Sequence, residues 1–502
     1  MPTTDSKEDT IQAFFGGSTM FLASGLGNGL GYLLGIFLAR LLGAEDFGLY
    51  AISLAIFNVL ALLSLCGADT AVVKFVSEAI RRGDRPLASQ TIAVALRFAL
   101  LAGVLAALFL ILSSRTWLAE LYGRTQLTTA LTVFALVIPV NMAVTMLLAS
   151  LQADHAFRGI VAVRYLWEPL GKLALTVLAV LAGWGLIGVI GGIGVASLVS
   201  LGLAASYTQT NFPGFATGPA AGRDLAAKLA RFGLPLLVMT IVGVVAPRTD
   251  VLFLGYWAEP TEAGLYQAAF QTAAILALAA AALDAAFAPL SAALLAAQDL
   301  ERLKSLYKDV SRWLLTLSFP VVLLLIIFGR EILSLFGPTF PLAAGCLFLL
   351  VVGQWVNNWT TFAQTILLMS GQTRLAMWNT LAFGGSLVFL NWLLIPRWGI
   401  TGAAAAVSLC MALGGLLRVG QVWMLFGLHP FSPELMKPFC AGVVALSAGY
   451  WLRGLLGPEF LLGLMVGMGL LYIGLLYGMK LEESDRVALA SLAQRVRGLR
   501  AV

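Results

Sequence analysis

The segment LGAEDFGLYA (residues 42–51) has a counterpart in YWAEPTEAGLY (residues 256–266), where the shared Gly-Leu-Tyr recurs 216 positions later. A second pair, WGLIG at 184–188 and WGITG at 398–402, is separated by 214 positions, and Asp69 and Asp284 are separated by 215. Three matches at almost one offset are typical of a duplicated structural unit.

Long apolar runs surround both copies. Hydrophobic residues make up 60% of the 502 positions and charged residues 11%, and the mean hydropathy is +0.92. Such a chain lacks the polar groups to cover its own surface, so lipid must be its solvent. At about 20 apolar residues per crossing, we predict an all-α integral membrane protein with about 14 transmembrane helices. Their expected positions are 12–38, 47–68, 88–112, 127–150, 163–182, 185–207, 233–256, 265–288, 313–336, 341–369, 375–395, 400–426, 437–455 and 460–479.

The offset between the copies spans six of these helices, an even number, so both copies cross the membrane in the same direction. We expect two parallel six-helix bundles related by a pseudo-two-fold axis along the membrane normal, with a substrate cavity between them. The predicted domains are 1–210, 211–430, an additional transmembrane helix pair at 431–480 and a cytoplasmic tail at 481–502. Most Lys and Arg residues fall in connections on the side of the N-terminus, which predicts cytoplasmic termini.

Five motifs give the chain a family resemblance. They are RLLGAEDFGLY at 40–50, CGADTAVVKFVSE at 66–78, FGPTF at 336–340, GQTR at 371–374 and LIPRWGITGAA at 394–404. With them the chain resembles the Wzx-type polysaccharide flippases, which handle O-antigen and teichoic-acid precursors, within the multidrug/oligosaccharidyl-lipid/polysaccharide exporter superfamily. The similarity runs from about residue 12 to 480, and the motifs are structural in character, so they specify the family better than the substrate.

The resemblance implies a flippase that works by alternating access in cell-surface polysaccharide and lipopolysaccharide biosynthesis. Its substrate is expected to be an undecaprenyl-pyrophosphate-linked oligosaccharide, carried across the bacterial inner membrane. We expect a monomer, without a cofactor or a nucleic-acid partner, that works beside glycosyltransferases and a polymerase of the same pathway.

Charged residues inside the predicted spans are the first candidates for a substrate site. They are Arg97, Arg248 and Arg418, and a charge at the bilayer centre costs about 2.5–3.5 kcal/mol. We predict that these arginines line the cavity and bind the pyrophosphate, since guanidinium matches phosphate geometry. The alternative is that Arg248 is neutralised by Asp250 and that Arg418 extends to the inner interface.

Four further charges are candidates for gating or ion coupling. Asp69 and Asp284 occupy matching positions near the predicted inner ends of spans 2 and 8, Lys74 follows Asp69, and Asp250 lies beside Arg248. Interfacial ion pairs or helix caps are the alternative. Three amphipathic stretches, 74–82, 298–312 and 482–500, are predicted to lie on the inner surface.

The sequence offers no support for catalysis. It contains no phosphate-binding loop, nucleophile elbow, zinc-binding His-Glu-x-x-His or Cys-x-x-Cys, and its four cysteines and two histidines are scattered. We therefore predict that the protein is not an enzyme and holds no metal. A cation-coupled multidrug exporter is one alternative function, disfavoured because residues 12–38 contain no carboxylate. A membrane-embedded glycosyltransferase or ligase is another, disfavoured by short outer connections.

Overall fold

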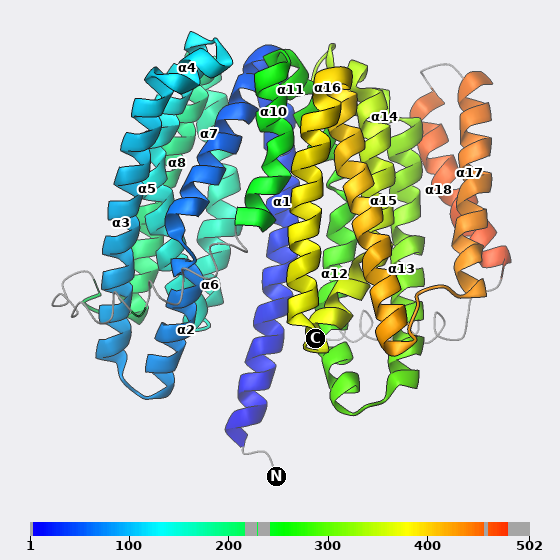
Figure 1. Cartoon of the computed structure of the whole chain (residues 1–502), viewed down its shortest axis with the longest axis horizontal. Helices are drawn as coiled ribbons and strands as arrows, with labels where there is room; N and C mark the ends of the chain where they lie inside the picture. The colour runs from blue at the N-terminus through cyan, green and yellow to red at the C-terminus, as the bar shows by residue number, and fades with distance from the viewer. Residues whose placement is uncertain (1–3, 216–227, 229–240, 456–459, 480–502) are drawn as a thin grey trace. The chain divides into compact units, whose positions relative to one another are not determined.

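The computed structural model describes residues 4–215, 228, 241–455 and 460–479, and all regular secondary structure in these ranges is helical. Figure 1 shows the course of the chain. The helices of the first half are α1 (Thr4–Leu65), α2 (Ala68–Arg81), α3 (Arg85–Arg115), α4 (Trp117–Tyr122), α5 (Thr125–Ala153), α6 (Phe157–Ile160), the π-helix η1 (Val161–Trp167), α7 (Glu168–Leu181) and α8 (Gly185–Asn211).

From residue 241 the described chain continues with a π-helix, η2 (Ile241–Val245), and a 3-10 turn, η3 (Ala246–Arg248). It continues through α10 (Thr249–Trp257), α11 (Pro260–Ala273), α12 (Leu276–Ala296), α13 (Leu300–Ile327), α14 (Gly329–Ser334), η4 (Phe340–Ala343), α15 (Ala344–Met369), α16 (Thr373–Phe426), η5 (Pro433–Leu435), α17 (Met436–Leu455) and α18 (Leu461–Gly478).

Two helices are too long for one crossing, and each is interrupted at a glycine. α1 has 62 residues with a non-helical Gly43 (φ 79°), and α16 has 54 residues with a non-helical Gly399 (φ 53°). A positive φ is strained for any residue with a Cβ, so glycine is the residue that permits these breaks. Both breaks fall between two predicted spans, so each of these helices consists of two legs.

The prediction of a multi-pass membrane protein is confirmed. Within the described residues, nine helices are long and apolar enough to cross a membrane. The apolar segment Gly463–Gly478 of α18 is shorter. Large hydrophobic side chains lie exposed along these helices, as lipid-facing surfaces require; Leu101, Leu108 and Leu112 of α3 are examples.

Two local features occur at the offset of the predicted repeat. Asp84 caps α3 by accepting a hydrogen bond from the Leu87 amide (2.9 Å), and Asp299, 215 positions later, caps α13 through the Arg302 amide (3.1 Å). Gly48 and Gly264, the glycines of the two Gly-Leu-Tyr motifs, also touch each other. A Cβ on Gly48 would strike the Pro260 carbonyl, and one on Gly264 would strike the Ala44 carbonyl. This reciprocal contact, with both pairs 216 positions apart, is the kind that a two-fold axis produces.

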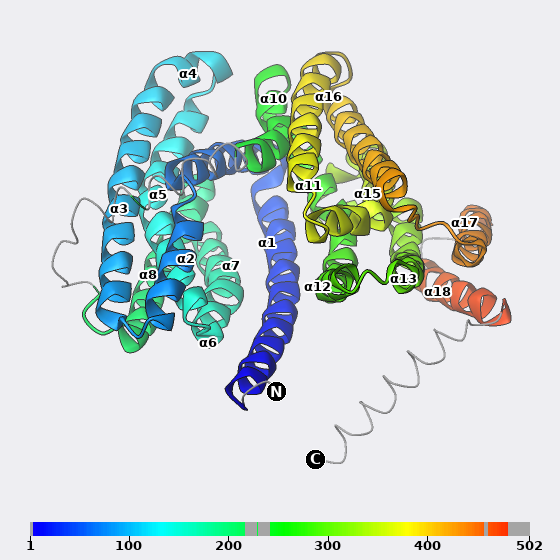
Figure 2. The same cartoon turned by 60° about the horizontal axis from the view of Figure 1, so that its bottom comes forward.

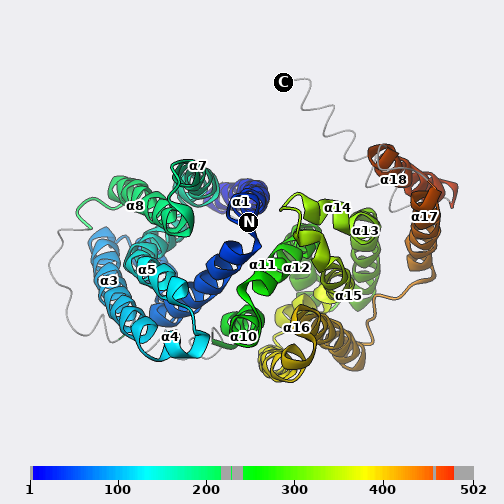
Figure 3. The ribbon, with the colours of Figure 1, turned by 90° about the horizontal axis from the view of Figure 1, so that it is seen from above.

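The chain divides into two compact units. Unit 1 comprises Met1–Thr272, Leu333–Cys346 and Thr380–Val407, and unit 2 comprises Ala273–Ile332, Leu347–Asn379 and Ser408–Val502. In unit 1, α5 packs against α3, α8 and α1 (Figure 3), and its inward residues are almost fully buried. In unit 2, α17 and α18 pack on each other and on α13 (Figure 2) through aromatic side chains. The predicted boundaries at 210, 430 and 480 stay a prediction.

The amphipathic stretches differ from their predicted form. Residues 298–312 do not make a separate helix, because α13 runs without a break from Leu300 to Ile327. Residues 74–82 belong to α2, which already begins at Ala68. The tail at 482–500 and the first part, 233–240, of the predicted span at 233–256 lie outside the described residues.

Candidate functional site

Arg97 lies on α3 with its side chain exposed. Residues four, seven and eleven positions further along the same helix are Leu101, Val104 and Leu108, all exposed. These spacings place them on one face of a helix. Arg97 therefore shares a face with large apolar side chains, and its role as a cavity cation stays a proposal.

Arg248 ends the 3-10 turn η3 and is half-buried, beside a carboxylate that has its own partners. Asp250 is buried and accepts hydrogen bonds from the Tyr266 hydroxyl and from the Val251 amide at 2.6 Å. Next to it, the Asn391 side-chain amide donates to the Thr249 hydroxyl at 3.1 Å. The change from π-helix to 3-10 turn to α-helix occurs around Pro247, which has no backbone N–H to donate to a regular helix.

Arg418 lies on α16 within unit 2, half-buried, and donates two hydrogen bonds to uncharged oxygens. Its Nε donates to the Gly414 carbonyl and its Nη2 to Asn357 Oδ1, both at 3.0 Å. Among the described residues, no carboxylate is ion-paired with this guanidinium. Arg418 is thus a cation inside a helical unit whose recorded partners are neutral.

The predicted gating residues are placed in different settings. Asp69 is in the first turn of α2, directly after a turn at Gly67, and Lys74 is exposed on α2 with its ammonium 5.5 Å from the centre of the Phe75 ring. Asp284 is instead inside α12, where it accepts a 2.5 Å hydrogen bond from the Thr365 hydroxyl. Equal spacing in the sequence therefore did not give Asp69 and Asp284 equal local surroundings.

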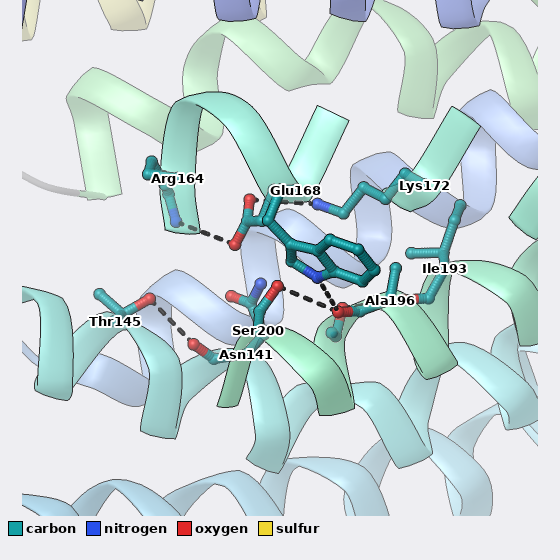
Figure 4. Close-up of polar contacts among 10 residues, drawn as sticks. Asn141, Thr145, Arg164, Glu168, Lys172, Ile193, Ala196 and Ser200 are labelled. Carbon is teal, nitrogen blue, oxygen red and sulfur yellow. Dashed lines mark hydrogen bonds and ion pairs between the residues drawn. The ribbon is translucent and has the colours of Figure 1, made fainter. Parts of the chain in front are cut away.

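A cluster of charges that the sequence reading did not select lies on η1 and α7 in unit 1. Figure 4 shows Glu168 between Arg164 and Lys172, one helical turn to either side. Its carboxylate is 3.8 Å from Arg164 Nη1 and 3.3 Å from Lys172 Nζ. The side chains of Arg164, Glu168 and Lys172 are 46%, 12% and 24% exposed. We call these three residues the triad.

Arg164, the first residue of the triad, lies on a π-helix. π-Helices are rare in proteins, but those that occur are often found at functional sites. The Trp167 indole N–H donates to the Ala196 carbonyl of α8 at 3.1 Å, and this bond fixes the π-helix to α8. Within α8, the Ser200 hydroxyl donates to the same carbonyl oxygen at 3.0 Å. On the other side, a Cβ on Gly27 of α1 would lie 3.2 Å from the Tyr165 ring. The π-helix, which carries Arg164, is therefore held by its neighbours on both sides.

The sequence contained a signal for this cluster. The predicted span 163–182 includes Arg164, Glu168 and Lys172, but the two cations were counted with the inner connections as orientation signals. The structure corrects this, since both lie within the continuous helical run from Val161 to Leu181. Opposite charges at spacings of four residues inside an apolar helix indicate an intramembrane ion pair.

The described residues contain no group of three or more His, Cys, Asp or Glu side chains that could hold a metal ion. The polar groups that they do place inside the helices are guanidinium, ammonium, carboxylate, hydroxyl and amide. These groups can bind an anion, exchange partners or hold a proton. The wider assignment of Arg97, Arg248, Arg418 and the four gating residues stays a proposal.

Comparison with known proteins gives one family model and two relatives in sequence. A family model described as "Polysaccharide biosynthesis protein" matches residues 37–339. The "Probable low-salt glycan biosynthesis flippase Agl15" of Haloferax volcanii is 22% identical over 458 residues, which cover 89% of this chain and 92% of that protein. The "Probable flippase AglR" of the same organism is 26% identical over 207 residues, 40% of this chain and 41% of that relative.

Solved structures share the fold. The lipid II flippase MurJ in an inward closed conformation superposes with a TM-score of 0.72 at 13% identity, covering 91% of this chain and 98% of that one. An inward-facing multidrug resistance MATE family transporter of the MOP superfamily gives a TM-score of 0.63 at 13% identity, covering 79% and 94%. At this level of identity the likeness concerns the fold.

Proposed function

Because the chain belongs to the polysaccharide biosynthesis protein family, we propose that it is a flippase that moves a lipid-linked oligosaccharide across a membrane by alternating access. The substrate that we propose is an undecaprenyl-pyrophosphate-linked oligosaccharide, and the membrane is the bacterial inner membrane, with both termini cytoplasmic. The names of the two Haloferax volcanii relatives support a glycan-biosynthesis flippase. The carrier lipid and the bacterial membrane rest on the motif resemblance.

The proposed architecture is 14 spans in two parallel six-helix bundles with an added helix pair. Three observations support it: the breaks at Gly43 and Gly399 that divide α1 and α16 into two legs, the equivalent caps at Asp84 and Asp299, and the reciprocal contact of Gly48 with Gly264. The caps recur at an offset of 215 residues and the glycines in contact at an offset of 216.

The observation that carries the function is the setting of Arg418. A guanidinium bound by neutral oxygens inside an apolar unit keeps its full positive charge, and removing that charge from water is costly. A phosphate group offsets the cost and accepts the guanidinium's remaining N–H donors. An anionic lipid headgroup is the ligand that fits such a cation in a membrane protein.

A lipid substrate also needs an apolar place for its chain. Unit 2 has an apolar cavity of about 420 Å³ between α17 and α18. Its lining includes Gly449 and Leu452 of α17 and Gly467 and Met468 of α18. Glycines leave room beside the helix backbones, and we propose that part of the isoprenoid chain lies there during transport.

The function is tested by reconstitution. Purified protein in liposomes receives a fluorescent pyrophosphate-linked oligosaccharide on a polyprenyl chain, and a membrane-impermeant quencher reports the outer-leaflet fraction. We expect the wild-type protein to expose lipid that protein-free liposomes protect, and Arg418→Met to slow this exchange by about tenfold or more, since one hydrogen-bonded charge is lost.

The matched control removes an arginine of unit 2 that is already paired. Arg453 Nη2 lies 2.7 Å from Glu331 Oε1, and the double variant Arg453→Ala with Glu331→Ala removes both charges. Exchange at the wild-type rate is expected for this control. Wild-type protein that leaves the lipid as protected as empty liposomes do would overturn the proposed function.

One observation favours a second function, a cation-coupled multidrug exporter. Such a carrier needs a buried carboxylate in its first bundle, and Glu168 in α7 is one, although residues 12–38 hold none. Its two cationic partners disfavour a cationic drug at this position. Efflux of a cationic dye from cells that express the protein, stronger than from cells without it, would support the exporter over the flippase.

A further inference from the structure

The triad extends from near the start of its helical run to the middle of that run. From Val161 to Leu181 the run is long enough for one crossing, and at about 1.5 Å per residue Lys172 is about 16 Å from its start and about 14 Å from its end. Arg164 lies nearer the end that we propose to be cytoplasmic and is the most exposed of the three, while Glu168 is the most buried. An anion arriving from that side meets Arg164 first.

The charges of the triad do not cancel. Two cations share one carboxylate, and the formal sum is one positive charge in an apolar surrounding. Each contact is also a single one: Glu168 Oε1 faces Arg164 at 3.8 Å, and Glu168 Oε2 accepts from Lys172 at 3.3 Å. Neither is the short bidentate pair that makes an arginine–carboxylate contact strong. An incoming phosphate can therefore compete for both cations.

The neighbouring helices supply little other charge. α5 contains no ionisable side chain and α8 contains only Tyr207, which packs against Gly159. The described side chains of the first leg of α1, from Ala23 to Gly43, include Tyr32, bonded to Thr272, and Arg40. Beside the triad, α5 and α8 add the neutral polar groups Asn141, Thr145 and Ser200, seen together in Figure 4.

We propose that the triad is a binding site for the phosphate or pyrophosphate group of a lipid-linked substrate, in which Glu168 holds Arg164 and Lys172 while the site is empty and the phosphate oxygens displace it. This inference rests on the proposed function and extends it to three residues of unit 1. A pyrophosphate diester carries two negative charges, which the two cations balance.

The test uses the full chain in zwitterionic lipid nanodiscs, with inorganic pyrophosphate as the probe. Trp167 adjoins the triad, so the fluorescence change that is present in wild-type protein and absent in Trp167→Phe reports on this site. We expect saturable binding by the wild type, and binding at least about tenfold weaker for Arg164→Gln with Lys172→Met, because two charge-assisted contacts are lost.

Glu168→Gln separates a binding role from a structural one. The variant keeps the shape of the side chain but removes the competing negative charge, so pyrophosphate is expected to bind as tightly as in the wild type or tighter. Weaker binding by Glu168→Gln, or equal binding by the double cation variant, overturns the proposal.

The neutral variant Arg164→Gln, Glu168→Gln, Lys172→Met controls for folding, since it leaves no unpaired charge and must elute as a monodisperse protein. The liposome assay separates the two proposals. If the triad variants exchange lipid normally and Arg418→Met does not, this inference fails and the function stands. If pyrophosphate binds at the triad but wild-type protein exchanges no lipid-linked oligosaccharide, the function fails and the site stands.

Discussion

Units 1 and 2 bury positive charge in two different ways. In unit 1, Arg164 and Lys172 share the Glu168 carboxylate, whereas in unit 2 Arg418 is bound by the Asn357 side chain and the Gly414 carbonyl, both neutral. A charge with a counter-ion is stable while the site is empty, and an anion must displace that counter-ion. A cation that is bound only by neutral dipoles has no counter-ion and still attracts an anion. A headgroup that binds in unit 1 must therefore first displace the Glu168 carboxylate, whereas in unit 2 it displaces no counter-ion.

The largest expected effect comes from removing the counter-ion of unit 1. Glu168→Ala leaves Arg164 and Lys172 without their carboxylate and should destabilise the protein by about 3–5 kcal/mol, towards the lower end because Arg164 is half exposed. Thermal unfolding in detergent measures the loss, and the neutral triple variant should recover most of it. A Glu168→Ala protein that unfolds at the same temperature as the wild type would show that the triad needs no internal counter-ion. That result would contradict the difference between the two units.

The matching change in unit 2 has the opposite sign. Arg418→Met removes a charge that has no counter-ion and should raise stability by up to about 2.5–3.5 kcal/mol, the cost of one charge at the bilayer centre, reduced by the two lost hydrogen bonds. The same unfolding assay measures the change. Destabilisation as large as that of Glu168→Ala would contradict the view that Arg418 is held by neutral groups alone.

A smaller effect is expected from the amide that binds Arg418. Asn357→Ala removes the acceptor of the Nη2 hydrogen bond and should cost about 1.5 kcal/mol, the lower value for a bond to a charged group. In a protein that already carries Arg418→Met, the same change should cost clearly less, and this double-mutant cycle isolates the pair. Additive losses would mean that Asn357 stabilises unit 2 in another way.

The smallest effect concerns an ion pair that water reaches. The side chains of Arg453 and Glu331 are 29% and 35% exposed. Removing both should change the stability by only about 0.2–1 kcal/mol, because solvent screens such pairs. Unfolding of the double alanine variant measures it. A loss as large as that from Glu168→Ala would show that burial does not distinguish the triad from a surface pair.

The sequence predicts the membrane fold well, because long apolar runs and glycine breaks act locally. The sequence shows a separate apolar run on each side of Gly43 and of Gly399. In the structure, a glycine with positive φ joins the two runs of each pair. The repeat offset was readable too. The contact between Gly48 and Gly264 could not be predicted from the sequence, because contact between segments 216 positions apart depends on packing.

The candidate site was less predictable. Selecting isolated charges found Arg418 but passed over Glu168 and its two cations, because Lys and Arg near the predicted inner end of a span also serve as orientation signals. The π-helix at Val161–Trp167 has no sequence signature, yet it carries Arg164 and leads directly into α7, which carries Glu168 and Lys172. Asp69 and Asp284 were paired by spacing alone, and one proved to lie in a first turn and the other within a helix.

The central claim is that cations inside the helices recognise the phosphate of a lipid-linked glycan during transport. Its most direct test compares two lipids in the same proteoliposomes, a polyprenyl-pyrophosphate oligosaccharide and its methyl ester, in which the negative charges are masked. We predict that the protein exchanges the anionic lipid between leaflets and leaves the neutral ester at the rate of protein-free liposomes. Equal exchange of both lipids would contradict the claim.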